Sequence, residues 1–274
     1  MKVALGIEYD GSQFYGWQKQ IALRTVQDAV EQALSKIATV PIKVICAGRT
    51  DTGVHGMNQV VHFETDVHRP LKSWIYGSNS SLPKDVVVKW AREVPDHFDA
   101  RFSAIARRYR YVIFNHAIRA AHLRSLVTWH YNRLNVNLMH QESQLLLGEN
   151  DYTSFRSSQC QANSPVRTIK DISVTSHGSL IFIDVEANAF LHHMVRNIAG
   201  VLMTVGSERE SAGWVNDLLE CKDRTKGAET SPPYGLYLYD IIYPDEFHIP
   251  SNASAPLYIH KPFGRQKLAS PIAI

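Results

Sequence analysis

The residues of this sequence best suited to chemistry lie in one polar stretch, residues 47–56. It holds Arg49 and Asp51 and is flanked by two apolar runs, Val44–Cys46 and Val60–Phe63, that we expect to be strands. In an extended segment, residues two apart project to the same side, and a guanidinium beside a carboxylate favours the ionised acid. An ionised Asp51 suits a nucleophile or an anion stabiliser better than a general acid. The alternative is a turn-capping Asp51 in a structural ion pair with Arg49.

The nine residues from Gly48 to Gly56, Gly-Arg-Thr-Asp-Thr-Gly-Val-His-Gly, resemble the catalytic motif of the TruA family of tRNA pseudouridine synthases. The resemblance implies that Asp51 is the catalytic residue. Thr52 stands where the family often has Ala, which leaves the aspartate in place. The similarity covers nearly the whole chain, from the first strand to about Pro244, with its motifs in the family order.

A second motif lies on an expected strand over residues 106–114, where Tyr109 and Arg108 project to opposite faces. Its Arg-Arg-Tyr-Arg-Tyr segment is similar to a family segment whose first tyrosine reaches the target uridine. The resemblance therefore implies that Tyr109 contacts the substrate. Taken alone, the strand pattern equally suits a half-buried tyrosine.

A third motif opens an expected helix over residues 191–205. The segment resembles the family helix whose arginine, here Arg196, pairs with the catalytic aspartate across the cleft. Neighbouring residues on a helix point about 100° apart, so we expect the adjacent His192 and His193 not to chelate one metal ion, and we expect no metal site. A later segment around Leu236 resembles the strand whose leucine packs near the target base, and with Phe190 it would line the pocket.

The order of expected elements predicts an α+β fold. The first hundred residues follow the order β-α-β-β-α-β of a ferredoxin-like or RRM-like unit, and the second half repeats the pattern. We therefore expect two RRM/ferredoxin-like halves with mainly antiparallel sheets flanking a central cleft. The expected divisions are residues 1–103 with the catalytic loop, residues 104–248, and an irregular tail over residues 249–274.

Composition indicates a globular protein in a reducing compartment. Of 274 residues, 45% are hydrophobic and 10% aromatic, which is sufficient for a core. The cysteines, Cys46, Cys160 and Cys221, are odd in number and lack metal-ligand spacing, which argues against a disulfide framework. The N-terminus resembles a strand and not a signal peptide, and no apolar run is long enough to span a bilayer. We expect a cytoplasmic protein with no membrane association.

Charge is distributed unevenly, although the net charge is only +3. Between Arg101 and Gln141 there are seven arginines and no acidic residue, a pattern typical of a surface that meets phosphates. The alternative is a solvated face balanced by acids from elsewhere. The expected RNA-contacting residues are Arg69, Phe98, Asp99, Ala100, Arg101, Phe102, Arg107, Arg108, Arg110, Gln159, Cys160, Gln161, Ala162 and Asn163.

The resemblance implies a homodimer that converts uridine to pseudouridine at positions 38, 39 and 40 of the tRNA anticodon stem-loop. The isomerisation needs no redox cofactor, ATP or metal, so we expect no cofactor. A paired uridine must first be flipped out, and Arg49 is our candidate to fill the gap. The sequence leaves open whether Asp51 attacks C1′, attacks the uracil ring or assists removal of the C2′ proton.

Two other classes of protein fit parts of the sequence. A non-catalytic RNA-binding protein with two RRM-like halves would keep the basic stretch, but the aromatic signatures of that class are absent from the sequence. A metal-dependent hydrolase using the histidines would lose activity in the presence of a chelator.

Overall fold

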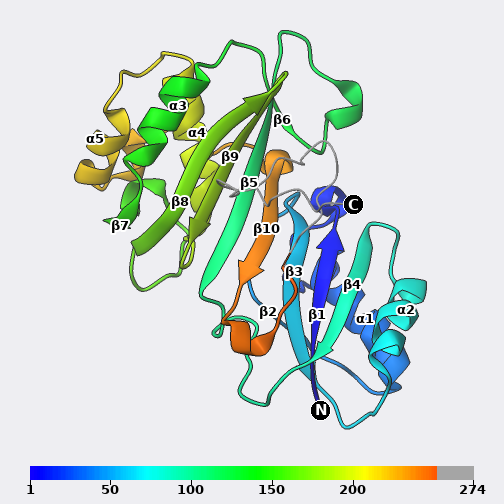
Figure 1. The fold of residues 1–274 in the computed structure, drawn as a ribbon. Coiled ribbons are helices and arrows are strands. Elements are labelled where there is room, and N and C mark those ends of the chain that lie inside the picture. Colours follow the sequence, from blue (N-terminus) through cyan, green and yellow to red (C-terminus); the bar gives the residue numbers. More distant parts are fainter. Residues whose placement is uncertain (252–274) are drawn as a thin grey trace, which may run out of the picture.

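The computed structural model describes residues 1–251, which form a mixed α/β fold around one open sheet (Figure 1). The strands are β1 (Lys2–Tyr9), β2 (Ile45–Cys46), β3 (His55–Glu64), β4 (Val86–Glu93), β5 (Ala106–Asn115), β6 (Thr128–His130), β7 (Gly148–Asp151), β8 (Val166–His177), β9 (Leu180–Ala187) and β10 (Leu236–Ile242). The helices are α1 (Val26–Ala38), α2 (Leu71–Ser81), α3 (Val136–Gln144), α4 (Met194–Gly206) and α5 (Trp214–Cys221). The expected tail over residues 249–274 lies almost wholly outside the described residues.

The sheet runs in the order β4-β1-β3-β10-β5-β9-β8-β7, with β2 paired to β3 and β6 paired to β5. Neighbouring strands are antiparallel except for the pairs β3/β10 and β5/β6. The expected α+β class with mainly antiparallel pairing is therefore confirmed. The expectation of two separate sheets is wrong, because the β3/β10 pair joins both halves into one sheet.

Two groups of helices cover different ends of the sheet (Figure 1). Helices α1 and α2 pack on the β1/β3/β4 end around a core that includes Leu5, Leu34 and Trp74. Helices α3, α4 and α5 pack at the β5/β8/β9 end around a larger core that includes Ile183 and Ile198. In both cases a helix stripe at 3.6-residue spacing covers the alternate apolar side chains of the strands, and this burial drives folding.

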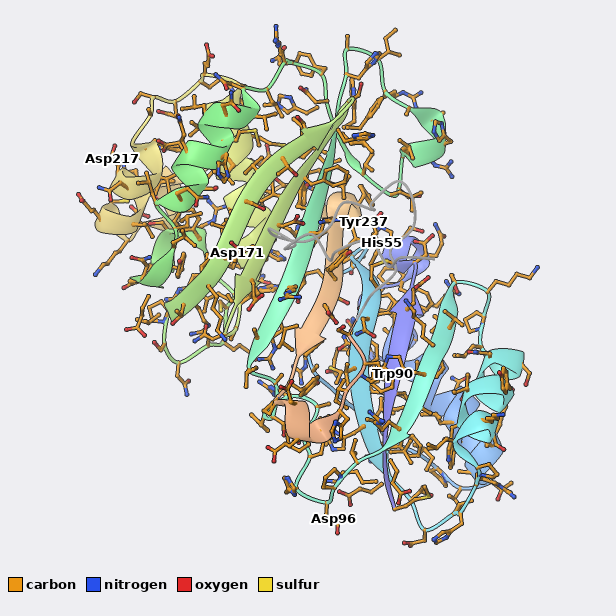
Figure 2. All side chains as sticks on the ribbon, in the orientation of Figure 1. His55, Trp90, Asp96, Asp171, Asp217 and Tyr237 are labelled. Atoms are coloured by element: carbon orange, nitrogen blue, oxygen red, sulfur yellow. The ribbon has the colours of Figure 1, made fainter. Side chains whose placement is uncertain are left out.

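The join between the halves lies at the centre of the molecule. There the register places Tyr237 opposite His55 and Leu238 opposite Gly56. The rings of His55 and Tyr237 stack with centroids 4.6 Å apart, and Figure 2 shows them together where β3 and β10 meet. The pairing fixes the ends of two segments at once, because the polar loop enters β3 at His55 and β10 begins at Leu236.

The expected elements are found, with shifted boundaries. Strand β3 begins at His55, inside the stretch that sequence analysis assigned to a loop, and α4 begins at Met194 and not at residue 191. Residues 153–155 form a short 3-10 helix. The shift of α4 matters most, because it moves two histidines out of the helix.

Candidate active site

The polar loop is held in place through its backbone. The N–H and carbonyl of Gly48 bond to the side-chain amide of Gln59 on β3, which is fully buried. The N–H of Ala47 donates to the carbonyl of Val60 at 2.8 Å, and the Thr50 hydroxyl lies 2.8 Å from that of Tyr9. These contacts leave the side chain of Asp51 free to face away from the sheet.

The aromatic segment after β1 supports the loop from the other side. The carbonyl of Thr50 accepts the N–H of Trp17 at 3.0 Å, and the carbonyl of Phe14 accepts the N–H of Gly53. Between them, Gly16 has φ +83°, and a Cβ there would lie 2.7 Å from the carbonyl oxygen of Thr50. Only glycine combines this backbone conformation with so close an approach.

Arg107 on β5 acts as a clamp. Its guanidinium donates to the backbone carbonyls of Ala47, Arg101, Ala104 and Asn188, with 3.2 Å to Ala47 and 2.9 Å to Asn188. Sequence analysis assigned this arginine to RNA phosphates. That assignment stays a prediction, and in the structure the carbonyls of four separate residues occupy the Nη1 and Nη2 donors.

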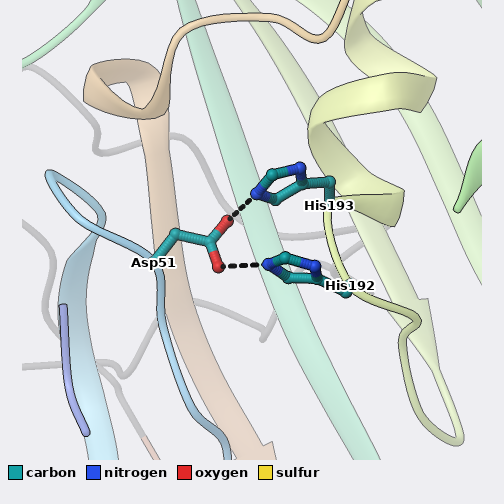
Figure 3. A group of neighbouring side chains, drawn as sticks. All are labelled: Asp51, His192 and His193. Carbon is teal, nitrogen blue, oxygen red and sulfur yellow. Dashed lines mark ion pairs between the residues drawn. The ribbon is translucent and has the colours of Figure 1, made fainter. Parts of the chain in front are cut away.

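The carboxylate of Asp51 meets three basic side chains from the other half of the chain. Nη1 of Arg196 donates to Oδ2 at 3.1 Å, while the same guanidinium holds the carbonyl of Ser231 through Nε at 2.8 Å. The Nε2 atom of His193 lies 3.3 Å from Oδ2, and that of His192 lies 3.5 Å from Oδ1 (Figure 3). The expected pairing of Asp51 with Arg196 is present in the structure.

The structure overturns the geometric argument made for the two histidines. They precede α4 in a turn, and His193 has the left-handed backbone conformation with φ +63°. The angle between neighbouring helical residues therefore does not apply, and both rings face one carboxylate, with centroids 3.9 Å apart. Partial burial lowers the pKa of His193 and so favours its neutral imidazole. The charge of Asp51 acts in the opposite direction.

Arg49 differs from the expected arrangement. Its side chain is exposed at the rim of the site, and among the described residues it forms no ion pair with Asp51. The Asp51 carboxylate instead pairs with Arg196, from the other half of the chain. Arg49 is therefore available for a partner from outside the chain.

The Asp51 carboxylate opens into a cavity of about 950 Å³, which is within the usual size range of small-molecule sites. Tyr109, Phe190 and Leu236 line it, and the rings of Tyr109 and Phe190 meet edge to face with centroids 4.9 Å apart. Burial raises the pKa of Tyr109 well above its usual value, and the nearby charge of Asp51 adds to the effect. The phenol therefore stays protonated at neutral pH, and it can stack or donate a hydrogen bond.

Burial also decides against Cys46 as a nucleophile. This thiol lines the cavity below the loop, and burial raises its pKa to about 11, against the opposing effect of Arg49. A thiol with this pKa stays protonated at neutral pH, and a protonated thiol is a poor nucleophile and metal ligand.

The expected RNA-contacting residues divide into buried and accessible groups. Three of them are fully buried: Phe98 and Ala100 belong to the core, and Arg110 forms a two-point ion pair with Asp184. In this structure their side chains are not accessible to a phosphate, and the assignments of these three residues stay predictions. Asp99 caps the turn at Arg101 and Phe102 through their N–H groups, and Arg108 pairs with Glu186 at 2.7 Å. The accessible residues are Arg69, Arg101, Phe102, Gln159, Gln161 and Asn163, with Cys160 and Ala162 half-buried.

Some residues of the site escaped sequence reasoning. The sequence argument considered the two histidines only as joint ligands of a metal ion, which it rejected, and not as neighbours of Asp51. Arg167 lines the cavity and its Nε has no partner among the described residues, although its Nη1 bonds to nearby backbone. The signal for Arg167 was weak, because a lone arginine at the start of a strand has no pattern around it.

Comparison with known proteins agrees with the motifs. A family model described as tRNA pseudouridine synthase matches residues 6–103 and 143–244, most of the chain. The two matched segments contain Asp51 and Arg196, one in each. The chain thus falls in the class of tRNA pseudouridine synthases, which are isomerases.

Curated relatives narrow the class further. A protein of Legionella pneumophila (strain Lens) named tRNA pseudouridine synthase A is 58% identical over 259 residues, which cover 94% of this chain and 99% of that protein. Proteins of the same name from Pseudomonas aeruginosa and Escherichia fergusonii are each 53% identical, cover 94% of this chain, and are themselves covered over 91% and 96% of their lengths. The chain belongs to the tRNA pseudouridine synthase A (TruA) family.

A solved structure of a Cbf5-Nop10-Gar1 complex is a distant match, with 12% identity and a TM-score of 0.35. The alignment covers 73% of this chain and 44% of that chain. Within residues 1–251, no helix combines the length and apolar character needed to cross a bilayer.

Proposed function

We propose that this protein isomerises uridine to pseudouridine at positions 38, 39 and 40 of the tRNA anticodon stem-loop, with Asp51 as the nucleophile and no cofactor. The observation that carries the proposal is the position of the Asp51 carboxylate. It lies on a loop whose backbone is fixed, it borders the cavity, and it accepts a hydrogen bond at 3.1 Å from Nη1 of Arg196 on helix α4. A charged and oriented carboxylate at the entrance to a base-sized cavity suits attack on a nucleotide.

The reaction is balanced without any added group. The N1–C1′ bond breaks, the uracil turns, and a bond forms between C5 and C1′. The proton on C5 then leaves and N1 ends protonated, so the product is an isomer of the substrate. Asp51 attacks C1′ or the uracil ring, or assists removal of the C2′ proton. Throughout the reaction, Arg196 holds the Asp51 carboxylate in a fixed orientation.

The other cavity residues hold the detached base. Tyr109 offers a protonated phenol and a ring face, while Phe190 and Leu236 provide an apolar wall that keeps uracil from escaping. Arg49 is exposed at the rim of the cavity. Its side chain enters the base-paired RNA stem in place of the flipped nucleotide, because its planar guanidinium stacks on bases. Flipping costs a few kcal/mol, which phosphate contacts must offset.

The accessible candidate residues supply those phosphate contacts, joined by Arg167 beside the cavity.

The protein acts in the cytoplasm as a homodimer. Residues 1–103 and 104–248 form its two functional halves, each of RRM or ferredoxin-like type, and the site lies where they meet. The β3/β10 pair supports this division, since Asp51 precedes one strand and Leu236 begins the other.

The test is conversion of uridine to pseudouridine in unmodified tRNA, with EDTA present, by the intact protein and by Asp51→Asn. Asparagine keeps the size of the side chain and removes its charge. We expect the variant to lose activity by about 10⁴-fold or more while tRNA affinity stays within a few-fold. If Asp51→Asn keeps its activity, the proposed role of Asp51 as the nucleophile is refuted. If the intact protein binds tRNA but forms no pseudouridine, the result favours a non-catalytic RNA-binding protein.

A further inference from the structure

Two imidazole nitrogens face the Asp51 carboxylate in addition to the Arg196 guanidinium. One atom from each of Asp51, His192 and His193 lies within 4.8 Å of the other two (Figure 3). Both imidazoles present Nε2 to the same carboxylate, although they belong to adjacent residues. The left-handed conformation of His193 makes this possible, because it turns its ring to the same side as that of His192.

The spacing is unlike that of hydrogen bonds. The Nε2-to-oxygen distances of 3.5 Å and 3.3 Å are longer than the usual 2.7–2.9 Å between a charged donor and a carboxylate. Each is close to the edge of a coordination tetrahedron, which is about 3.3–3.5 Å for metal–ligand bonds of about 2.0–2.2 Å. The two distances involve different carboxylate oxygens, Oδ1 for His192 and Oδ2 for His193. With one ligand atom of each residue within 4.8 Å of the others, the three side chains can bind one small divalent cation after a small adjustment of their positions.

The donor set selects a class of cation. Two imidazoles and one carboxylate suit Zn²⁺, Co²⁺ or Ni²⁺, whereas Mg²⁺ and Ca²⁺ prefer oxygen ligands alone. The exposed fractions of the three side chains, 26% for Asp51, 37% for His192 and 26% for His193, leave the site open to solvent and to an ion. Arg196 at 3.1 Å weakens binding by repulsion, so the affinity falls below that of a structural zinc site.

We propose that Asp51, His192 and His193 form a binding site for Zn²⁺ or a similar transition-metal ion, and that occupation of this site switches isomerisation off. The inference rests on the proposed role of Asp51. An ion bound to the carboxylate occupies the lone pairs that attack the nucleotide, and its charge displaces the Arg196 guanidinium. The metal is an inhibitor here, so the reaction itself proceeds without one.

Binding is tested first on the full chain without RNA. Co²⁺ gives visible absorption bands when four-coordinate, and competition with a chromophoric chelator gives the Zn²⁺ affinity. We expect one ion per chain, and a loss of affinity of about 100-fold or more in the double variant His192→Gln/His193→Gln. His177→Gln removes an exposed histidine at the end of β8, and Cys160→Ser removes the thiol that accepts the His192 N–H, so both serve as controls that keep binding.

Inhibition is tested next, with free Zn²⁺ set by a metal buffer. We expect reversible loss of isomerisation in the intact protein, recovery on adding EDTA, and no inhibition by Mg²⁺ at the same concentration. Equal Zn²⁺ affinity in the intact protein and the double histidine variant would overturn the proposal, as would loss of binding only in Cys160→Ser. Activity of the metal-free protein in EDTA is measured separately, so failure of this site is distinguishable from failure of the proposed function.

Discussion

The two regions that meet at the active site contribute to it in different ways. The loop over residues 47–54 is fixed through backbone hydrogen bonds to Gln59, Trp17 and Arg107. The facing segment, residues 190–196, contributes the Arg196 guanidinium and the Nε2 atoms of His192 and His193, which face the Asp51 carboxylate. One side therefore sets the position of Asp51 and the other sets the electrostatic surroundings of its carboxylate, so we expect substitutions on the two sides to have different effects.

The largest effect is expected on the electrostatic side. Arg196→Gln removes the cation that bonds to Asp51 and leaves the side chain long enough to reach Ser231. We expect a loss of about 10²–10³-fold in kcat/KM, the usual result of removing one preorganised donor, with little loss of stability. Single-turnover kinetics on unmodified tRNA measures this, with Arg209→Gln, an exposed arginine beyond α4, as the control. A loss below tenfold would contradict the assigned role of Arg196.

On the backbone side, Gly16→Ala sharpens the comparison. Its new Cβ would lie 2.7 Å from the Thr50 carbonyl oxygen. In addition, the backbone at residue 16 has φ +83°, a conformation that is unfavourable for alanine. We expect the free energy of unfolding to fall by about 2–3 kcal/mol. The matched control is Gly178→Ala, with φ +57° and nothing within 4 Å, for which only the conformational part, about 1 kcal/mol, applies. Urea denaturation of both variants measures the difference, and equal losses would show that contact with the loop is unimportant.

The adjacent arginines of β5 provide a third test. Arg107→Gln leaves carbonyls of the loop region without a donor, and we expect a loss of about 1–2 kcal/mol. Arg108→Gln breaks a partly exposed pair with Glu186, and we expect a loss of at most about 1 kcal/mol. Thermal and urea unfolding rank the two variants. The reverse order would indicate that Arg107 serves RNA and not the fold.

The smallest effect concerns Asp10, which lies 3.2 Å from Nδ1 of His55 at the base of β3. The hydrogen bond with His55 and those with Ser12 hold the pKa of Asp10 well below its usual value, against the effect of partial burial. A carboxyl whose folded-state pKa is lowered stabilises the protein fully above its unfolded value of about 3.9, and this stabilisation is lost as pH falls toward the lowered pKa. Because Asp10 is half exposed, we expect less than about 1 kcal/mol. Asp10→Asn should therefore flatten the acid limb of stability against pH, and an unchanged limb would contradict the assignment.

The sequence was a good guide where local pattern and tertiary structure agree. The strand at the N-terminus, the β-α-β-β-α-β order of the first half and the Gly48–Gly56 motif each depend on neighbours within a few residues. The motif resemblance also predicted the pairing of Asp51 with Arg196, which no local pattern contains.

The sequence was a poor guide where distant segments decide the outcome. Arg107, Arg108 and Arg110 form one basic run, yet one clamps carbonyls, one pairs with Glu186 and one is buried on Asp184. Their roles depend on strand β9 and on the loop, which composition does not reveal. The helix start was misplaced for a similar reason, because the left-handed turn at His193 has no signature in residue types.

The strand pair between β3 and β10 has a consequence for the order in which the molecule is made. The hydrogen bond from Asn58 to Asp240 spans 182 residues, and Arg196 reaches Asp51 across 145. During synthesis the aspartate emerges early, but the strand that carries Leu236 is among the last described segments to leave the ribosome. Contacts of such long sequence separation form slowly. The nascent chain therefore carries Asp51 long before it has a complete pocket, so the site is assembled only when synthesis of the described residues is nearly finished.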